Sequence, residues 1–218
     1  MKKIIAFILL LNGTVFVFAQ APKAFIREMT GTVEIKKAGT ENWIPAKLND
    51  PIAESTIIST SFKSSAVVAV GNSTLNVRAL TRMSLETLMN SDNTDSVNIG
   101  LNTGRIRADV KPPAGGRTDF KVQANKATAS VRGTAFEMDT VRLQVIEGSV
   151  SFQPAGGNSR PVVVKAGQAS WIASNGAALS PVSALEATIA LPALAGEVYV
   201  DSGRGGKSSL SIVVNVIE

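Results

Sequence analysis

The chain of 218 residues contains no cysteine and no histidine. Their absence excludes disulfides, thiol redox chemistry, Ser-His-Asp and Cys-His nucleophilic systems, and the metal sites that need thiolate or imidazole ligands. Aromatic side chains are scarce too: there are two Trp and one Tyr, so stacking platforms for single-stranded nucleic acid are few. We therefore predict a protein that has no cofactor, is not an enzyme and does not bind nucleic acid.

The first 21 residues have the features of a secretory signal peptide. Lys2 and Lys3 precede an apolar run that begins at Ile4, and Ala19 and Ala21 give the small-residue spacing of a cleavage site. We predict cleavage after Ala19 or Ala21, with no stable transmembrane segment afterwards; an uncleaved membrane anchor is the alternative. Export combined with a lack of cysteine is typical of bacteria, which predicts a periplasmic, secreted or cell-surface location.

The formal net charge is +5, and the basic residues are scattered rather than gathered into one stripe. Such a mild excess of positive charge allows a weak attraction to anionic polymers of the cell envelope.

Apolar residues alternate with polar ones along most of the chain, with Gly, Asn, Asp or Pro at the end of each alternating stretch. This period of two predicts half-buried strands. We predict an all-β domain of short strands over residues 22–177; an irregular β-solenoid, a sandwich and an open barrel are all compatible with this pattern. Residues 178–218 are expected to form a C-terminal extension with a terminal strand. Weak helical patterns occur at 81–90 and 183–191.

Four polar motifs are candidate sites. Glu137 and Asp139 would project from one face of a strand, as a hydrolase carboxylate pair could, but two solvated carboxylates are the simpler interpretation. The turn SDNTDS carries Asp92, Asn93 and Asp95 without the spacing of a calcium loop. The stretch GRGGKSS ends like a phosphate-binding loop but lacks its first glycine, and the sequon NST at 72–74 has no role in a bacterial protein.

One stretch, VRGTAFEM, is more specific. Its pattern of Val131, Arg132, Gly133, Thr134 and Phe136, with a strand on each side, resembles the hallmark of a FecR-type domain. The similarity extends over about residues 25 to 175 through stretches such as GTVEIKKAG, GNSTLNV, LNTGRIRADV and VVVKAGQASWI.

The resemblance implies a β-rich, solenoid-like domain of the bacterial envelope. The best-known members of the family are transmembrane regulators that relay ligand occupancy of an outer-membrane transporter to a cytoplasmic sigma factor. No cytoplasmic segment precedes the apolar run here, and only about 40 residues follow the domain. The chain is therefore more similar to stand-alone exported FecR-domain proteins than to the full regulators.

The motif residues are expected to have a structural role. Gly133 interrupts the alternation, as at a bulge or a close backbone approach, and the planar guanidinium of Arg132 suits a clamp on a neighbouring coil. Thr134 can bond its own turn, and Phe136 faces the core. On this interpretation Arg132→Ala lowers folding stability; contact of Arg132 with a ligand or partner is the alternative.

Three functions follow from these observations. The first is a non-catalytic envelope binding or scaffold module that acts through contacts with an unidentified envelope protein, in a sensory or regulatory role. The second is a protein that binds cell wall or surface polysaccharide. The third, a hydrolase that uses Glu137 and Asp139, is the least favoured.

Overall fold

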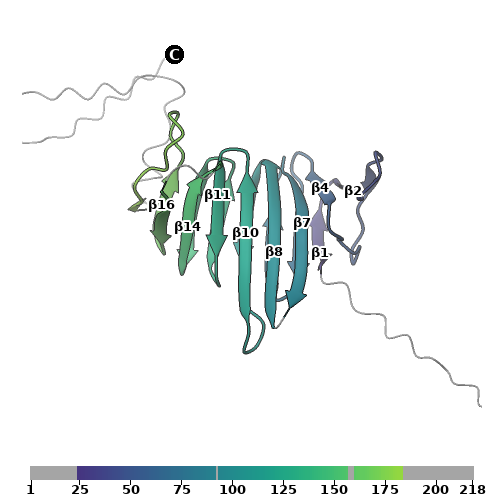
Figure 1. The fold of residues 1–218 in the computed structure, drawn as a ribbon. Helices are drawn as coiled ribbons and strands as arrows, with labels where there is room; N and C mark the ends of the chain where they lie inside the picture. Colours follow the sequence, from purple (N-terminus) through teal and green to yellow (C-terminus); the bar gives the residue numbers. More distant parts are fainter. Residues whose placement is uncertain (1–23, 92, 157–159, 184–218) are drawn as a thin grey trace, which may run out of the picture.

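The computed structural model describes residues 24–91, 93–156 and 160–183. Their regular structure consists of strands and includes no helix (Figure 1), which confirms the all-β prediction. Accordingly, nothing in these ranges forms a helix that could cross a membrane. The described strands are β1 (Ala24–Thr30), β2 (Val33–Lys36), β3 (Ile44–Pro45), β4 (Thr56–Thr60), β5 (Ser65–Val70), β6 (Ser73–Val77), β7 (Arg82–Ser91), β8 (Thr94–Thr103), β9 (Arg105–Asp109), β10 (Arg117–Ala124), β11 (Ala127–Val131), β12 (Ala135–Asp139), β13 (Arg142–Glu147), β14 (Ser149–Pro154), β15 (Val162–Lys165), β16 (Gln168–Trp171) and β17 (Val182–Ser183).

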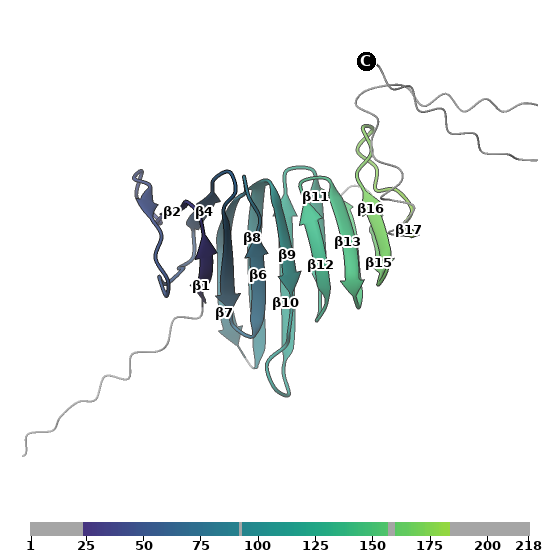
Figure 2. The same ribbon diagram turned by 180° about the vertical axis from the view of Figure 1, so that it is seen from behind.

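The strands form two sheets that lie face to face (Figures 1 and 2). The eight-stranded sheet has the order β1-β5-β6-β9-β12-β13-β16-β17, and the nine-stranded sheet has the order β15-β14-β11-β10-β8-β7-β4-β2-β3. Apart from β2 and β3, the strand order in each sheet follows the order along the chain. Described neighbours pair in antiparallel fashion except β8 and β10, which are parallel. Both sheets are open, and the predicted solenoid is not confirmed.

The core lies between the sheets because alternate side chains of every long strand point inward. Strand β5 has a strict alternation of half-buried and buried residues, and β6 and β11 have the same pattern. The largest fully buried side chains include Phe120 and Phe152 from the nine-stranded sheet and Phe136 from the eight-stranded sheet. All three belong to one continuous apolar cluster. The period-two pattern therefore predicted correctly which side chains leave water.

The helical pattern noted at 81–90 corresponds to strand β7, which pairs with β4 on one side and β8 on the other. Met83 and Leu85 are spaced two apart and both point into the core, as a strand requires. The second helical pattern, at 183–191, lies outside the described residues apart from Ser183. That residue ends β17, so the described β-structure continues past the predicted domain boundary at 177.

The chain crosses repeatedly from one sheet to the other, and three of these corners contain a glycine that packs against a hydroxyl residue of a neighbouring corner. The hydroxyl side chains are buried, with at most 5% of each residue exposed. The contacting pairs are Gly31 with Ser64, Gly104 with Thr81, and Gly148 with Thr134.

Gly104, between β8 and β9, shows why these positions need glycine. Its φ is +85°, and an added Cβ would lie 2.5 Å from Thr81 Cα and 2.6 Å from the Leu80 carbonyl oxygen. In return, the Thr81 hydroxyl accepts a hydrogen bond from Arg105 N at 3.0 Å and donates one to Arg105 O at 3.1 Å. The corner is thus closed by a contact that leaves no room for a methyl group.

We predict that Gly104→Ala lowers the free energy of unfolding by about 3 kcal/mol or more, because left-handed strain and overlap with backbone atoms add together. Gly39→Ala is the matched control: Gly39 has a φ of +70°, but an added Cβ meets nothing within 4 Å. That variant should lose only about 1 kcal/mol, the conformational part of the cost. Urea denaturation measures both losses, and equal losses would contradict a steric role for the Gly104 corner.

Candidate functional site

Two corner loops at one end of the molecule lie side by side. Loop 61–64 joins β4 to β5, and loop 78–81 joins β6 to β7. Leu80 N donates a hydrogen bond to Ser61 O at 3.3 Å, and Thr60 N donates one to Thr81 O at 2.9 Å. Thr81 N in turn donates to the buried Thr60 hydroxyl at 3.0 Å. We call the two loops together the apex; these bonds fix its backbone.

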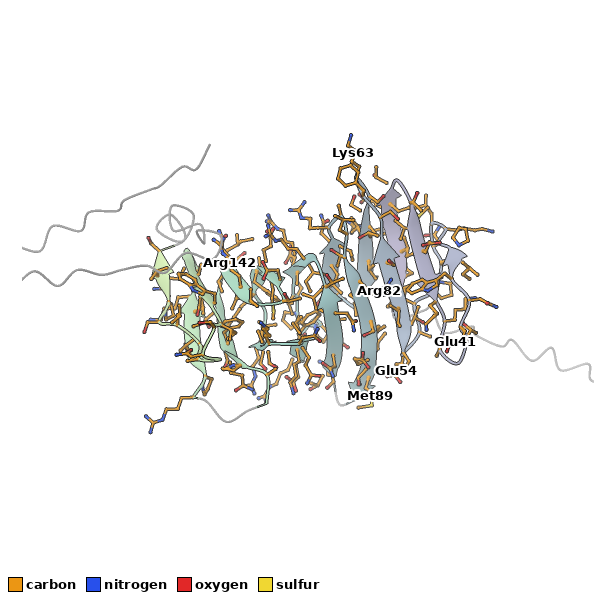
Figure 3. All side chains as sticks on the ribbon, turned by 90° about the horizontal axis from the view of Figure 1, so that it is seen from above. Glu41, Glu54, Lys63, Arg82, Met89 and Arg142 are labelled. Carbon is orange, nitrogen blue, oxygen red and sulfur yellow. The ribbon has the colours of Figure 1, made fainter. Side chains whose placement is uncertain are left out.

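The apex carries two large apolar side chains into solvent. Phe62 is 70% exposed and Leu80 is 60% exposed. Leu80 and Lys63 both have a left-handed backbone, with φ of 56° and 55°, which is uncommon for residues other than glycine. Lys63 projects beyond the ribbon on one side of the molecule, whereas Met89 lies on the opposite side (Figure 3). Strained backbone that exposes apolar side chains marks the apex as a candidate binding surface.

A groove runs from the apex onto the outer face of the eight-stranded sheet. Its volume is about 760 Å³, and it is open to solvent. We call it the arginine groove. Its charged lining consists of Lys63, Arg78, Arg105, Glu137 and Asp139, and Leu80 contributes an apolar wall. The strand register brings these residues together, because Asp139 on β12 pairs with Arg105 at the start of β9.

The charges in the groove form a small network of ion pairs. Glu137 lies 3.4 Å from Arg78 and 3.4 Å from Arg105, and Asp139 lies 3.5 Å from Arg105. The arginine side chains are 47% and 51% exposed, while the two carboxylate side chains are 27% and 22% exposed. The carboxylates therefore lie deeper, and the guanidinium groups present much of their surface to solvent.

Glu137 and Asp139 share one face of β12, as the sequence predicts, but their partners differ from those of a hydrolase pair. One oxygen of Asp139 accepts hydrogen bonds from Val141 N at 2.9 Å and Arg142 N at 2.8 Å, which closes the turn into β13. The other oxygen faces Arg105. Both carboxylates are thus engaged by cations or by turn amides, which hold the two side chains in place.

The motif Val131–Thr134 lies at the corner from β11 into β12, at the end of the sandwich opposite the apex. Val131 and Phe136 are buried on either side of the corner. Gly133 has a φ of +83° and sits in the corner itself rather than inside a bulged strand. A register shift does occur close by, between Ala135 and Phe136.

Two of the contacts predicted for the motif are not made within the part of the chain that the structure describes. The Arg132 side chain is exposed, and it makes no hydrogen bond or ion pair with any residue in the described ranges. Thr134 is buried, but its hydroxyl has no hydrogen-bond partner there; its methyl group faces Gly148 instead. The structural role of the motif as a whole stays a prediction.

The other motifs remain separate from the groove. Asn93 donates a hydrogen bond to Ala114 O at 3.3 Å, and the described residues contain no group of acidic side chains that could hold a metal ion. Asp92 and the stretch GRGGKSS lie outside the described residues. Asn72 of the sequon is in the exposed turn between β5 and β6, where it donates a hydrogen bond to Pro112 O at 3.3 Å.

The family model described as "FecR protein" matches residues 56–151. Residues 56–151 are therefore identified as a FecR domain. The matched segment begins with β4 and ends within β14, so the FecR domain contains the apex, the charged side chains of the arginine groove and the motif around Arg132. This confirms the resemblance found in the sequence.

Two crystal structures of a candidate anti-sigma factor from Parabacteroides distasonis ATCC 8503 are similar to the chain that carries this FecR domain. Each has a TM-score of 0.47 and 18% sequence identity, and each comparison covers 58% of this chain. The matched part spans 59% of the length of the other protein. No curated protein matches the sequence.

Sequence reasoning missed Phe62, Leu80, Arg78 and Arg105 as site residues of the FecR domain. The two apolar residues could have been found from the sequence. Phe62 and Leu80 each stand in a short polar interruption between two alternating stretches, where an apolar side chain is not expected to be buried. The arginines gave no local signal. They are 27 residues apart in the sequence and meet only through the pairing of β6 with β9.

We predict that Arg132→Ala changes the free energy of unfolding by no more than about 0.5 kcal/mol, because the side chain is exposed and unbonded. Phe136→Ala, four residues along, should lose about 3 to 5 kcal/mol, because it empties a fully buried site. Chemical denaturation of the two variants tests the assignment. A loss above 2 kcal/mol for Arg132→Ala would restore the clamp inferred from the sequence.

Proposed function

We propose that this protein is a non-catalytic binding module of the bacterial cell envelope that acts in sensing or regulation through contacts with another protein. The observation that carries the proposal is the apex, where Phe62 and Leu80 are held exposed beside a groove lined by arginines. Exposed apolar side chains next to arginine are typical of protein-binding surfaces. The FecR domain supports a regulatory role, since the best-known members of that family are regulators.

The proposal assigns no catalysis to the groove. Its two carboxylates are held by Arg78, Arg105 and the turn after β12. The chain has no histidine or cysteine to serve as an alternative nucleophile or base. These facts favour recognition over hydrolysis as the use of this surface.

A polysaccharide-binding function is less well supported. Sugar rings commonly stack on exposed aromatic faces, and the chain has only two Trp residues. Trp43 lies beside β3 of the nine-stranded sheet with the Arg82 guanidinium 5.1 Å from its ring centre, while Trp171 belongs to β16 of the other sheet. The two rings do not build one platform, so a protein partner is the better proposal.

We predict that the protein isolated from its host begins at Gln20 or Pro22. The basic start, the apolar run and the Ala19 and Ala21 spacing support export and cleavage at one of these positions. N-terminal sequencing of the protein from a periplasmic or cell-surface fraction measures this directly. A protein that keeps Met1 and stays with the membrane fraction would instead support the uncleaved anchor.

We predict that the apolar apex is needed for regulation in the host. Deletion of the gene should change the abundance of a defined set of transcripts, and the unaltered gene should restore them. A gene with Phe62→Ser and Leu80→Ser should not restore them, because the apolar contact with the partner is lost. RNA sequencing of the strains, with immunoblots to show equal protein levels, gives the measurement.

The matched control in that experiment is Met89→Ser. Met89 is 57% exposed, close to the value for Leu80, but lies on the opposite side of the molecule. It should restore the transcripts fully. Full restoration by the apex variant, or no transcript change on deletion, would contradict the proposed function.

A further inference from the structure

Resting on the proposed function, we propose that the arginine groove binds an extended acidic segment of the partner protein, with an apolar side chain of that segment packed against Leu80 and Phe62. The proposal names the chemistry of the partner: at least one carboxylate, and a large apolar residue within about two positions of it. Four features of the groove lead to this choice.

The first feature is an excess of positive charge. Lys63, Arg78 and Arg105 face only two carboxylates in the lining of the groove. Arg107 adds a further cation at the same face, because it lies two residues after Arg105 and pairs in register with Glu137. A ligand that brings negative charge would complete the balance, whereas a basic ligand would be repelled.

The second feature is that the arginines retain bonding capacity. Their separations from the carboxylates, 3.4 to 3.5 Å, are longer than the roughly 2.7 to 2.9 Å of a strong charge-assisted hydrogen bond. A guanidinium has five donors, and each arginine side chain is about half exposed. Glu137 and Asp139 therefore orient Arg78 and Arg105 from below without using all of their donors, which leaves a fork that suits a carboxylate above.

The third feature is the apolar wall beside these cations. Arg78 and Leu80 are two residues apart in one loop, and both line the groove. Phe62 is in the adjoining loop, which is joined to Leu80 by the hydrogen bond to Ser61 O. An apolar side chain on the ligand can therefore contact Leu80 and Phe62 while a carboxylate next to it reaches Arg78. A purely anionic polymer would leave this wall unused.

The fourth feature is the fixed backbone of the groove. Arg78 N donates a hydrogen bond to Arg105 O at 3.0 Å, and Arg105 N donates one to the Thr81 hydroxyl at 3.0 Å. These bonds join the two arginine positions to each other before any ligand arrives. Because this backbone is already fixed, binding costs the protein little conformational entropy. The groove can therefore bind a flexible segment that itself becomes ordered.

Fluorescence anisotropy with the full chain tests the proposal. The probe is a labelled heptapeptide in which glutamates alternate with leucine and phenylalanine. Two matched peptides replace either the glutamates by glutamine or the apolar residues by serine. We expect the probe to bind at least fivefold more tightly than either matched peptide at low salt, and to weaken as salt screens the arginines. Equal affinity for all three peptides would overturn the proposal.

Variants assign the binding to the groove. Arg105→Gln and Arg78→Gln should each lower the affinity for the probe at least fivefold, and Leu80→Ser should lower it by a similar factor. Arg105→Lys keeps the positive charge but loses the forked pair of guanidinium donors. Its affinity for the probe should lie between that of the unaltered protein and that of Arg105→Gln. Arg132→Gln and Met89→Ser are the controls, because they remove an exposed arginine and an exposed apolar residue outside the groove. Urea denaturation confirms that each variant is folded, and undiminished binding by both folded arginine variants would overturn the site.

Dextran sulfate serves as an anionic probe without apolar groups. If it competes with the peptide and its own binding depends on Arg78 and Arg105 but not on Leu80, the groove is a site for anionic polymers, and the peptide proposal fails.

The proposed function and the proposed peptide site can fail independently of each other. Peptide binding without any transcript effect of the apex variant would leave the groove chemistry intact and remove the regulatory function. A transcript effect of the apex variant without peptide binding would leave the regulatory function intact and remove the proposed groove chemistry.

Discussion

At three of the corners where the chain changes sheets, the structure depends on a close contact between a glycine and a buried hydroxyl residue of a neighbouring corner. At each crossing the backbone leaves one ladder of hydrogen bonds before it joins another, so its polar groups need other partners. Thr81 provides such partners: its hydroxyl accepts a hydrogen bond from Arg105 N and donates one to Arg105 O. Gly104, which has no side chain, allows the two corners to come this close. The Ser64 hydroxyl likewise accepts a hydrogen bond from Thr32 N at 2.9 Å, beside Gly31.

The candidate binding surface is a consequence of these corners. Two tight crossings side by side give loops so short that their middle residues must point outward, and Phe62 and Leu80 occupy those places. The left-handed backbone of Lys63 and Leu80 costs stability, and the bonds around Thr60 and Thr81 hold it in place. A surface built in this way stays presented in the unbound protein, as the proposed binding function requires.

Much of the fold could be read from the sequence, because an alternating strand reveals its buried face by itself. The burial of Phe120, Phe136 and Phe152 follows this alternation. The sheet to which each strand belongs could not be read in this way, since a crossing at Gly104 and a hairpin at Gly71 present similar small polar residues. The choice between two open sheets and a solenoid depends on those crossings. For the same reason the arrangement of Arg78, Arg105 and Glu137 depended on pairing register, which no local pattern encodes.

The motif around Arg132 shows the limit of reasoning from residue type. An arginine before a glycine suggested a clamp because a guanidinium has many donors, but a donor set predicts a contact only where acceptors lie within reach. At the corner after β11 the Arg132 side chain is exposed and bonds to none of the described residues, whereas at the groove Glu137 and Asp139 lie beneath two other arginines. Exposed ion pairs of this length add little to stability. These ion pairs are thus not needed to hold the sandwich together, although Asp139 also closes the turn into β13. The proposed recognition of a charged partner gives the half-exposed guanidinium groups of Arg78 and Arg105 a use.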